Sequence, residues 1–357
     1  MRIKWGLLAR FLVIFGVCGY TNEWTSAQEP EQPAPAPALT ETELEAVEGA
    51  VYQPLYEEGY SAPTTDNWYF GAEALFMHRS RYRDKRLVTE TATNPNTVLG
   101  TTDDLDFGYN PGMRFTLGRP ISGNRRLEFI FSGVYDQDSR FNAVGMSLNA
   151  PFTTGGANAL FSDMEGVQID ANTETSQLEL NIYRPITERY TLINGLRYMH
   201  LRDMFRYTAF NTMAPPNPNR FTQGEFLNET VNDWFGYQIG GNATTVFRNW
   251  LELSATVKTG LFATISDLDQ RTSVVDNGVD TLINFTSDSE TGFGGMIEVG
   301  LTATIRITDN FLFRTGYQLQ MMSGLALAGN NIGEIQTMEN TGVLVFDGAT
   351  VGFIYLR

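Results

Sequence analysis

Charged residues recur between apolar neighbours along several stretches of this sequence. Arg114, Arg197 and Glu298 each have an apolar residue on both sides. Successive side chains of a β-strand point to opposite faces, so such charges share one face and their neighbours share the other. The residues predicted on this polar face are Glu73, Arg114, Glu128, Glu179, Arg197, Glu252, Lys258, Glu298 and Arg314.

These nine residues carry both signs of charge, which favours pairing across neighbouring strands. Counting back from the predicted turns puts Arg114 roughly level with Glu128, and Glu179 roughly level with Arg197. Two alternatives stay open. The charges could form a polar path with mild ion selectivity, or they could pair into a salt-bridged plug.

The sequence offers little for catalysis. The chain has two histidines, His78 and His200, and it lacks the Gly-x-Ser-x-Gly motif of a nucleophile elbow. A serine hydrolase also needs its histidine beside a nucleophile and an orienting acid. We therefore expect a structural role for both histidines and predict that the protein is not an enzyme.

Metal and cofactor sites are not indicated either. The densest acidic cluster, Asp103-Asp104-Asp106, lacks the spacing and glycine of a twelve-residue calcium loop. We interpret it as part of an acidic external loop. The single cysteine, Cys18, excludes a disulfide or a cysteine metal site elsewhere in the chain. We predict no cofactor.

The first 27 residues resemble a secretory signal peptide. Arg2, Lys4 and Arg10 accompany a short apolar core at 11–19, and Thr25-Ser26-Ala27 ends in a small residue. The core is too short to cross a bilayer as a helix. We therefore predict export and cleavage near Ala27.

The remaining chain is acidic. Removal of residues 1–27 takes away three basic residues and one acidic residue, so the formal net charge of −16 becomes about −18, which disfavours a nucleic-acid partner. Residues 28–67 contain nine acidic residues, a Pro-Ala repeat and no Lys or Arg. We predict that this segment is a disordered linker.

From residue 68 to 357 the chain alternates apolar and polar residues, as half-buried strands do. Most of these stretches have the ten or so residues with which a tilted strand crosses a bilayer. The predicted strands are 68–80, 107–118, 126–137, 174–183, 191–203, 233–247, 250–264, 292–305, 311–322 and 342–356.

The connections between these strands alternate between long and short. The long ones are predicted near 81–106, 138–173, 204–232, 265–291 and 323–341. Outer-membrane barrels have short periplasmic turns and longer external loops, whereas a soluble β-sandwich does not sort its loops by length. We therefore predict an all-β fold, a transmembrane antiparallel up-and-down β-barrel of ten strands. A hairpin starting near Ala159 and ending at Asp170 would raise the number to twelve.

The two faces of the predicted strands suit this fold. Met113, Phe115 and Leu117 would face lipid, while the nine charged residues would line the lumen. Aromatic residues fall at the predicted periplasmic ends of strands, as in an interfacial girdle: Trp68, Tyr190, Trp250, Phe311 and Tyr355. Both chain termini would then be periplasmic.

Several short motifs resemble a known family. They are the stretch from Trp68 to Leu75 (WYFGAEAL), Gly195-Leu196-Arg197-Tyr198, Arg314-Thr315-Gly316-Tyr317 followed by GLALA from Gly324, and FDGATVG from Phe346. Over residues 68–357 the chain resembles the putative beta-barrel porin family found in planctomycete-type bacteria. The resemblance implies an outer-membrane barrel with a pore role and no catalytic motif.

Together these observations predict a narrow pore for passive diffusion of ions or small polar solutes across an outer membrane. A ten-stranded barrel is little wider than the eight-stranded kind, whose interior side chains can fill. The alternative is a closed barrel that serves as a structural or adhesive surface protein. The expected partners are outer-membrane lipids and the solutes themselves.

Overall fold

The computed structural model describes residues 68–90, 97–122, 124–151, 161–211, 223–276, 279–332 and 338–357. The predicted signal peptide and linker, 1–27 and 28–67, lie outside the described residues. Among the described residues, no helix is long and apolar enough to cross a membrane. One short 3-10 helix is present, η2 (Thr102–Asp104). The strands are β1 (Tyr69–Arg79), β2 (Arg86–Glu90), β3 (Thr97–Thr101), β4 (Asn110–Ile121), β5 (Arg125–Asn149), β6 (Met164–Pro185), β7 (Tyr190–Phe210), β8 (Gln223–Arg248), β9 (Leu251–Asp276), β10 (Val279–Arg306), β11 (Phe311–Leu325) and β12 (Gly342–Leu356).

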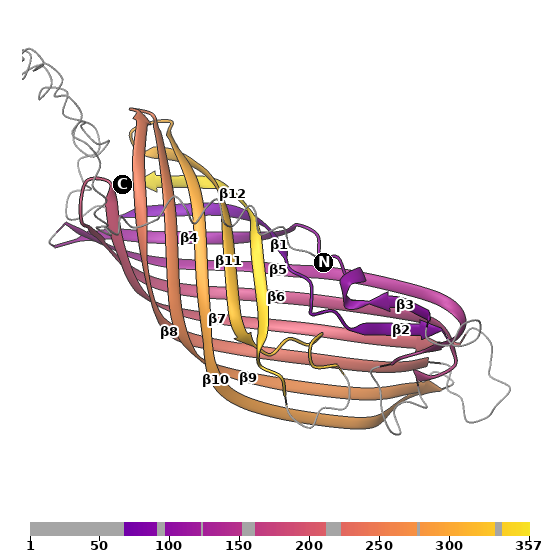
Figure 1. Cartoon of the computed structure of the whole chain (residues 1–357). Helices are drawn as coiled ribbons and strands as arrows, with labels where there is room; N and C mark the ends of the chain where they lie inside the picture. The colour runs from indigo at the N-terminus through magenta and orange to yellow at the C-terminus, as the bar shows by residue number, and fades with distance from the viewer. Residues whose placement is uncertain are drawn as a thin grey trace, which may run out of the picture. The chain divides into compact units, whose positions relative to one another are not determined.

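Ten of these strands close into a barrel (Figure 1). Consecutive strands from β4 to β12 pair antiparallel with one another, and β1 pairs with β4 on one side and with β12 on the other. The pairing of β5 with β6 completes the ring. The remaining strands, β2 and β3, pair with each other as a hairpin. β2 also pairs with the C-terminal end of β5, at Leu148 and Asn149, so the hairpin is not among the strands that close the ring. The predicted ten-stranded antiparallel up-and-down barrel is confirmed.

The strands on one side of the barrel are much longer than predicted. β5 to β10 have 21 to 28 residues each. Most of the predicted long loops at 138–173, 204–232 and 265–291 are extensions of these strands, and the β9–β10 connection at 277–278 is short. The suggested hairpin from Ala159 to Asp170 is wrong, because Asp170 lies inside β6. The strands keep their backbone hydrogen bonds beyond the apolar outward residues. There the outward side chains are polar, and water can solvate them.

The outward face of each long strand changes character along its length. On β9, Leu253, Val257 and Leu261 are exposed on the outer surface, and the same row continues as Asp267 and Asp269. An apolar band followed by charged residues marks the limit of the lipid-facing part of a transmembrane strand. Beyond that limit the strands continue as a polar extension.

The four connections predicted to be short lie together at one end of the barrel, at 122–124, 186–189, 249–250 and 307–310. The first and last described residues are at this end too, where the Arg357 amide donates to the Trp68 carbonyl over 3.2 Å. Aromatic side chains predicted for an interfacial girdle are exposed here, among them Trp68, Tyr190 and Trp250. We call this end the short-turn end.

The two faces of β10 give a test of the membrane-spanning band. Leu301 is exposed within the apolar band, and Ser289 lies on the same outward row beyond it. We expect Leu301→Arg to lower the free energy of unfolding by about 2–4 kcal/mol, because the charge would face hydrocarbon. Ser289→Arg should change it little. Urea unfolding of the barrel in lipid vesicles measures both, and equal losses would contradict the assigned band.

Candidate functional site: a layer of ion pairs inside the barrel

Four charged side chains from two pairs of adjacent strands, β6 with β7 and β9 with β10, meet at one depth inside the barrel. Glu179 on β6 lies directly opposite Arg197 on β7, and Lys258 on β9 lies opposite Glu298 on β10. The strand alternation that puts Leu178, Leu196 and Val257 on the outer surface turns these four side chains inward. We call Glu179, Arg197, Lys258 and Glu298 the ion-pair layer.

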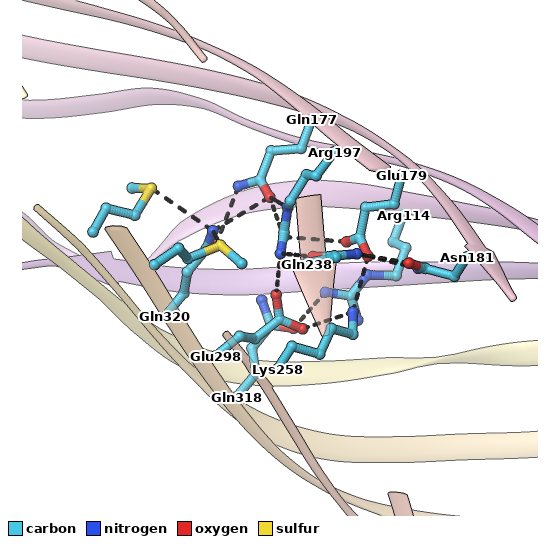
Figure 2. A network of polar contacts seen from close by, with 12 residues as sticks. Arg114, Gln177, Glu179, Asn181, Arg197, Gln238, Lys258, Glu298, Gln318 and Gln320 are labelled. Atoms are coloured by element: carbon cyan, nitrogen blue, oxygen red, sulfur yellow. Dashed lines mark hydrogen bonds and ion pairs between the residues drawn. The ribbon is translucent and has the colours of Figure 1, made fainter. Parts of the chain in front are cut away.

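Each cation of the layer contacts both carboxylates (Figure 2). Arg197 lies 3.1 Å from Glu179 and 2.8 Å from Glu298, and the Lys258 Nζ lies 2.9 Å and 3.1 Å from the same two acids. All four residues are at least nine-tenths buried. Two positive and two negative charges balance. The cost of removing four charges from water is therefore offset by close opposite charges.

Amide side chains complete the layer. Gln238 donates to Glu179 over 2.8 Å and to Asn181 over 2.7 Å. The Nε of Arg197 donates to Gln177 over 3.1 Å, and Gln177 in turn contacts Gln320 on the opposite wall at 3.2 Å. Figure 2 shows these side chains reaching toward one another across the interior. The side chains of the layer and its amide partners therefore reach across the interior, from β6 and β7 to β10 and β11.

A second group of predicted lumen residues lies beside the layer. Glu73 on β1 lies between Arg114 and Arg314, at 3.5 Å from each. Arg114 also donates to Gln318 on β11. Glu128 pairs with Arg126 at 2.9 Å and accepts a hydrogen bond from the Tyr69 hydroxyl.

The predicted level pairing of Arg114 with Glu128 is wrong. Arg114 lies opposite Glu73 on one side and Ser132 on the other, and Glu128 lies opposite Gly118. β4 continues to Ile121, which pairs with Arg125, so the turn follows later than predicted and Arg114 comes level with Ser132, four residues beyond Glu128.

A small cavity lies next to the ion-pair layer. It has a volume of about 100 Å³ and is lined by charged and polar side chains that include Arg126, Glu128, Lys258, Glu298 and Arg314. The last of the nine predicted residues, Glu252, lies toward the short-turn end on the inner row of β9, opposite Thr304. The inner wall around the layer is therefore polar and has room for a few water molecules.

The other half of the interior is filled by a segment that leaves the wall. Next to the last residue of β11, Gly324 adopts a φ of +90°, where a side chain would meet the Phe293 carbonyl. Residues 326–332 then turn into the barrel and are buried. We call residues 326–332 the inserted segment.

Side chains of the wall hold the inserted segment by its backbone. Asn232 donates to the Ala326 carbonyl and accepts from the Ala326 amide, both over 2.8 Å. Asn228 donates to the carbonyls of Ala328 and Asn331, both over 2.7 Å. These contacts satisfy backbone groups that no strand pairs, as burial requires.

The segment between β1 and β4 covers the same space. Arg79 and Asp203 form a fully buried ion pair at 2.8 Å, with the Arg79 guanidinium stacked 4.1 Å from the centre of the Phe107 ring. Asp203 also accepts from the Ala328 amide over 2.8 Å. Burial lowers the pKa of Lys85, which donates to the Asn330 carbonyl. Apolar side chains of both segments join one core with the inner wall, among them Leu87, Leu105, Phe107, Leu327 and Trp234.

The residues that hold these segments were not among those predicted from the sequence. Asn228, Thr230 and Asn232 alternate on one face of β8. That spacing marks an inward polar row, but the predicted strand began at residue 233. Asp203 was the last residue of the predicted strand 191–203. The sequence around it carried no signal that the strand continues and turns this side chain inward.

The histidines and the acidic cluster lie apart from the interior. His78 lies 3.3 Å from Asp347, and His200 lies 2.9 Å from Asp233, on the outward rows of their strands. Asp104 caps η2 by accepting from the Thr101 amide over 2.7 Å. Across the described ranges, no group of three or more His, Cys, Asp or Glu residues could hold a metal ion.

Comparisons with known proteins give a family and a set of structures of similar fold. A family model described as "Putative beta barrel porin-7" matches residues 72–350. The outer membrane protease OmpT from Escherichia coli is 10% identical, with a TM-score of 0.43, 82% of this chain covered and 98% of the other. The translocator domain of the autotransporter NalP from Neisseria meningitidis is 9% identical, with a TM-score of 0.35, 88% and 95% covered. A Pseudomonas aeruginosa FadL homologue is 8% identical, with a TM-score of 0.31, 85% and 93% covered. No curated protein matches the chain.

The balance of charges in the ion-pair layer gives a test by double-mutant cycle. Lys258→Met leaves two buried acids with one cation, so we expect the free energy of unfolding to fall by about 3–5 kcal/mol. Adding Glu298→Gln restores neutrality and should recover part of that loss. Urea unfolding in vesicles measures the four proteins of the cycle.

The exposed pair Arg271–Asp280, 2.7 Å apart, provides the matched control. Arg271→Met should cost less than about 1 kcal/mol because solvent screens that pair. Additive losses for Lys258→Met and Glu298→Gln would contradict a coupled layer.

Proposed function

The chain belongs to the putative beta barrel porin-7 family, and we propose that it is an outer-membrane pore with a narrow lumen that is closed at rest. Ions or small polar solutes pass only after two internal barriers, the ion-pair layer and the inserted segment, are displaced. Glutamate, arginine and lysine side chains of the wall then set the ion selectivity, as charged rings do in other channels.

The observation that carries this proposal is the chemistry of the layer. A barrel with a purely structural interior is filled at least as stably by apolar side chains, since a buried ion pair contributes little net stability. Here the middle of the barrel holds four balanced charges, and a polar cavity adjoins them. The polar ion-pair layer lies below the apolar core that the inserted segment forms with the wall. This arrangement fits a pathway that is closed at one side.

The inserted segment suits a barrier that can move. Its backbone is held by asparagine side chains of the wall instead of a strand ladder. Such contacts can be exchanged for water one at a time, whereas a β-strand of the barrel cannot leave without opening the ring. The barrier can therefore open while the barrel stays closed as a sheet.

A second candidate function rests on a different observation. β5 to β10 extend well beyond the apolar band, and their outward rows there carry exposed charges such as Arg140, Arg202 and Asp269. A permanently closed barrel with this polar extension would serve as a structural or adhesive surface protein. Under this alternative, the barriers never open.

Conductance in a planar bilayer separates the two candidates. We expect rare small steps from the wild-type chain and more frequent steps from Asn228→Ala with Asn232→Ala, which removes four hydrogen bonds to the inserted segment. Asn110→Ala with Asn172→Ala is the control, because both side chains make exposed local contacts. Lys258→Met should shift the steps toward cation preference.

Silence from all variants, with each shown to be folded and inserted, would refute the pore and support the closed surface protein. Steps that are identical in the two asparagine variants would refute the role of the inserted segment. A folded barrel is recognised by different gel mobility before and after boiling.

We also propose that the short-turn end faces the periplasm, so that residues 68 and 357 lie on that side. Ser122 in a short turn and Thr281 near the tip of β10 are both exposed. Ser122→Cys should resist a membrane-impermeant thiol reagent added to intact cells, and Thr281→Cys should react. The reverse pattern would invert the orientation.

A further inference from the structure

The charged residues of the barrel are sorted by end. At the short-turn end the described residues include two exposed acidic side chains, Glu188 and Asp309, and a set of arginines distributed around the circumference: Arg119, Arg125, Arg184, Arg189, Arg248, Arg306 and Arg357. This concentration of positive charge contrasts with a chain whose formal net charge is −16. We call these seven residues the rim arginines.

Several rim arginines continue the lipid-facing rows of their strands. Arg119 follows Leu117 by two positions on β4, Arg184 follows Ile182 on β6, and Arg357 follows Tyr355 after β12. Two residues advance a strand by about 7 Å. These guanidinium groups therefore begin where the apolar band ends, at the depth of lipid headgroups.

The rim arginines have neighbours typical of a lipid interface. The Arg119 guanidinium lies 5.4 Å from the centre of the Trp68 ring, and Trp68, Tyr190 and Trp250 are exposed at the same end. Tryptophan and tyrosine favour the headgroup region of a bilayer. In the described part of the chain, no ion pair involves Arg125, Arg184, Arg248 or Arg357.

The opposite end of the apolar band differs. There the outward rows reach acids such as Asp233, Asp267 and Asp347, and outward arginines such as Arg202 pair with acids, in this case Glu229 at 2.6 Å. An even spread of arginine would not produce this contrast. The asymmetry therefore points to a feature of the leaflet at the short-turn end.

We propose that the rim arginines bind the phosphate groups of anionic phospholipids in the leaflet at the short-turn end. Guanidinium groups bind phosphate oxygens through paired hydrogen bonds. A ring spread over six strand ends around a membrane barrel matches the shell of lipids that surrounds it, whereas a soluble anion would need convergent side chains in one pocket. This inference does not depend on whether the lumen conducts.

Tryptophan fluorescence provides the readout. In the exported chain, residues 28–357, the tryptophans are Trp68, Trp234 and Trp250. Trp68 and Trp250 are exposed at the rim, while Trp234 is fully buried inside the barrel. Lipids with brominated acyl chains quench only tryptophans that they contact, so competition between brominated and ordinary lipids gives a relative binding constant.

The experiment compares phosphatidylglycerol with phosphatidylcholine around the folded chain in vesicles. At low salt, we expect phosphatidylglycerol to bind about fivefold more tightly than phosphatidylcholine. This factor is the contribution of one arginine near an anionic lipid surface. The preference should fall as salt rises. Replacement of Arg125, Arg184, Arg248 and Arg357 by glutamine should lower this ratio, and Arg119, Arg189 and Arg306 would account for the preference that remains.

The matched control replaces four arginines beyond the other end of the apolar band, Arg140, Arg202, Arg206 and Arg271, by glutamine. It changes the net charge equally and should keep the wild-type ratio. A ratio near one for the wild type, a preference insensitive to salt, or equal loss in both variants would overturn the proposal. The salt series uses the wild type alone, so the test does not depend on folding of the rim variant.

Discussion

Inside a bilayer the backbone has no water to bind, so every N–H and C=O of a membrane strand must pair with a neighbouring strand. The ring closed by β5 with β6 meets this constraint for the whole sheet. Closure forces the strict alternation of two faces. Each strand then puts one row of side chains into lipid and the other into a space that ten strands make narrow. The polar interior and the apolar belt are both consequences of that closure.

A narrow interior brings opposite walls within reach of long side chains. Arg197 on β7 contacts Glu298 on β10, and Gln177 contacts Gln320, across the barrel. Charges at this depth are stable only in balanced groups. The ion-pair layer satisfies this condition with two cations and two carboxylates. The same contacts that make the buried charges tolerable also span the lumen.

The half of the barrel away from the short-turn end stabilises its interior differently. There apolar residues of the inserted segment and of the β1–β4 segment form a core with the wall. Backbone groups of the inserted segment that have no strand partner form hydrogen bonds with Asp203, Asn228 and Asn232. The interior therefore contains two stacked layers of different chemistry. The polar one depends on electrostatic balance, and the apolar one depends on packing and a few hydrogen bonds.

Local pattern was enough to predict ten strands, their two faces and an antiparallel barrel, because alternation with a period of two is written in neighbouring residues such as Met113, Arg114 and Phe115. It also placed Glu179 level with Arg197, since the short turn between β6 and β7 sets their register. Three features depended on tertiary structure. The level of Arg114 changed because β4 continues to Ile121. The length of β5 to β10 was hidden because polar stretches pair as well as apolar ones once a neighbouring strand is present. The meeting of Arg197 with Glu298 across the lumen required the closed ring, which joins residues far apart in sequence.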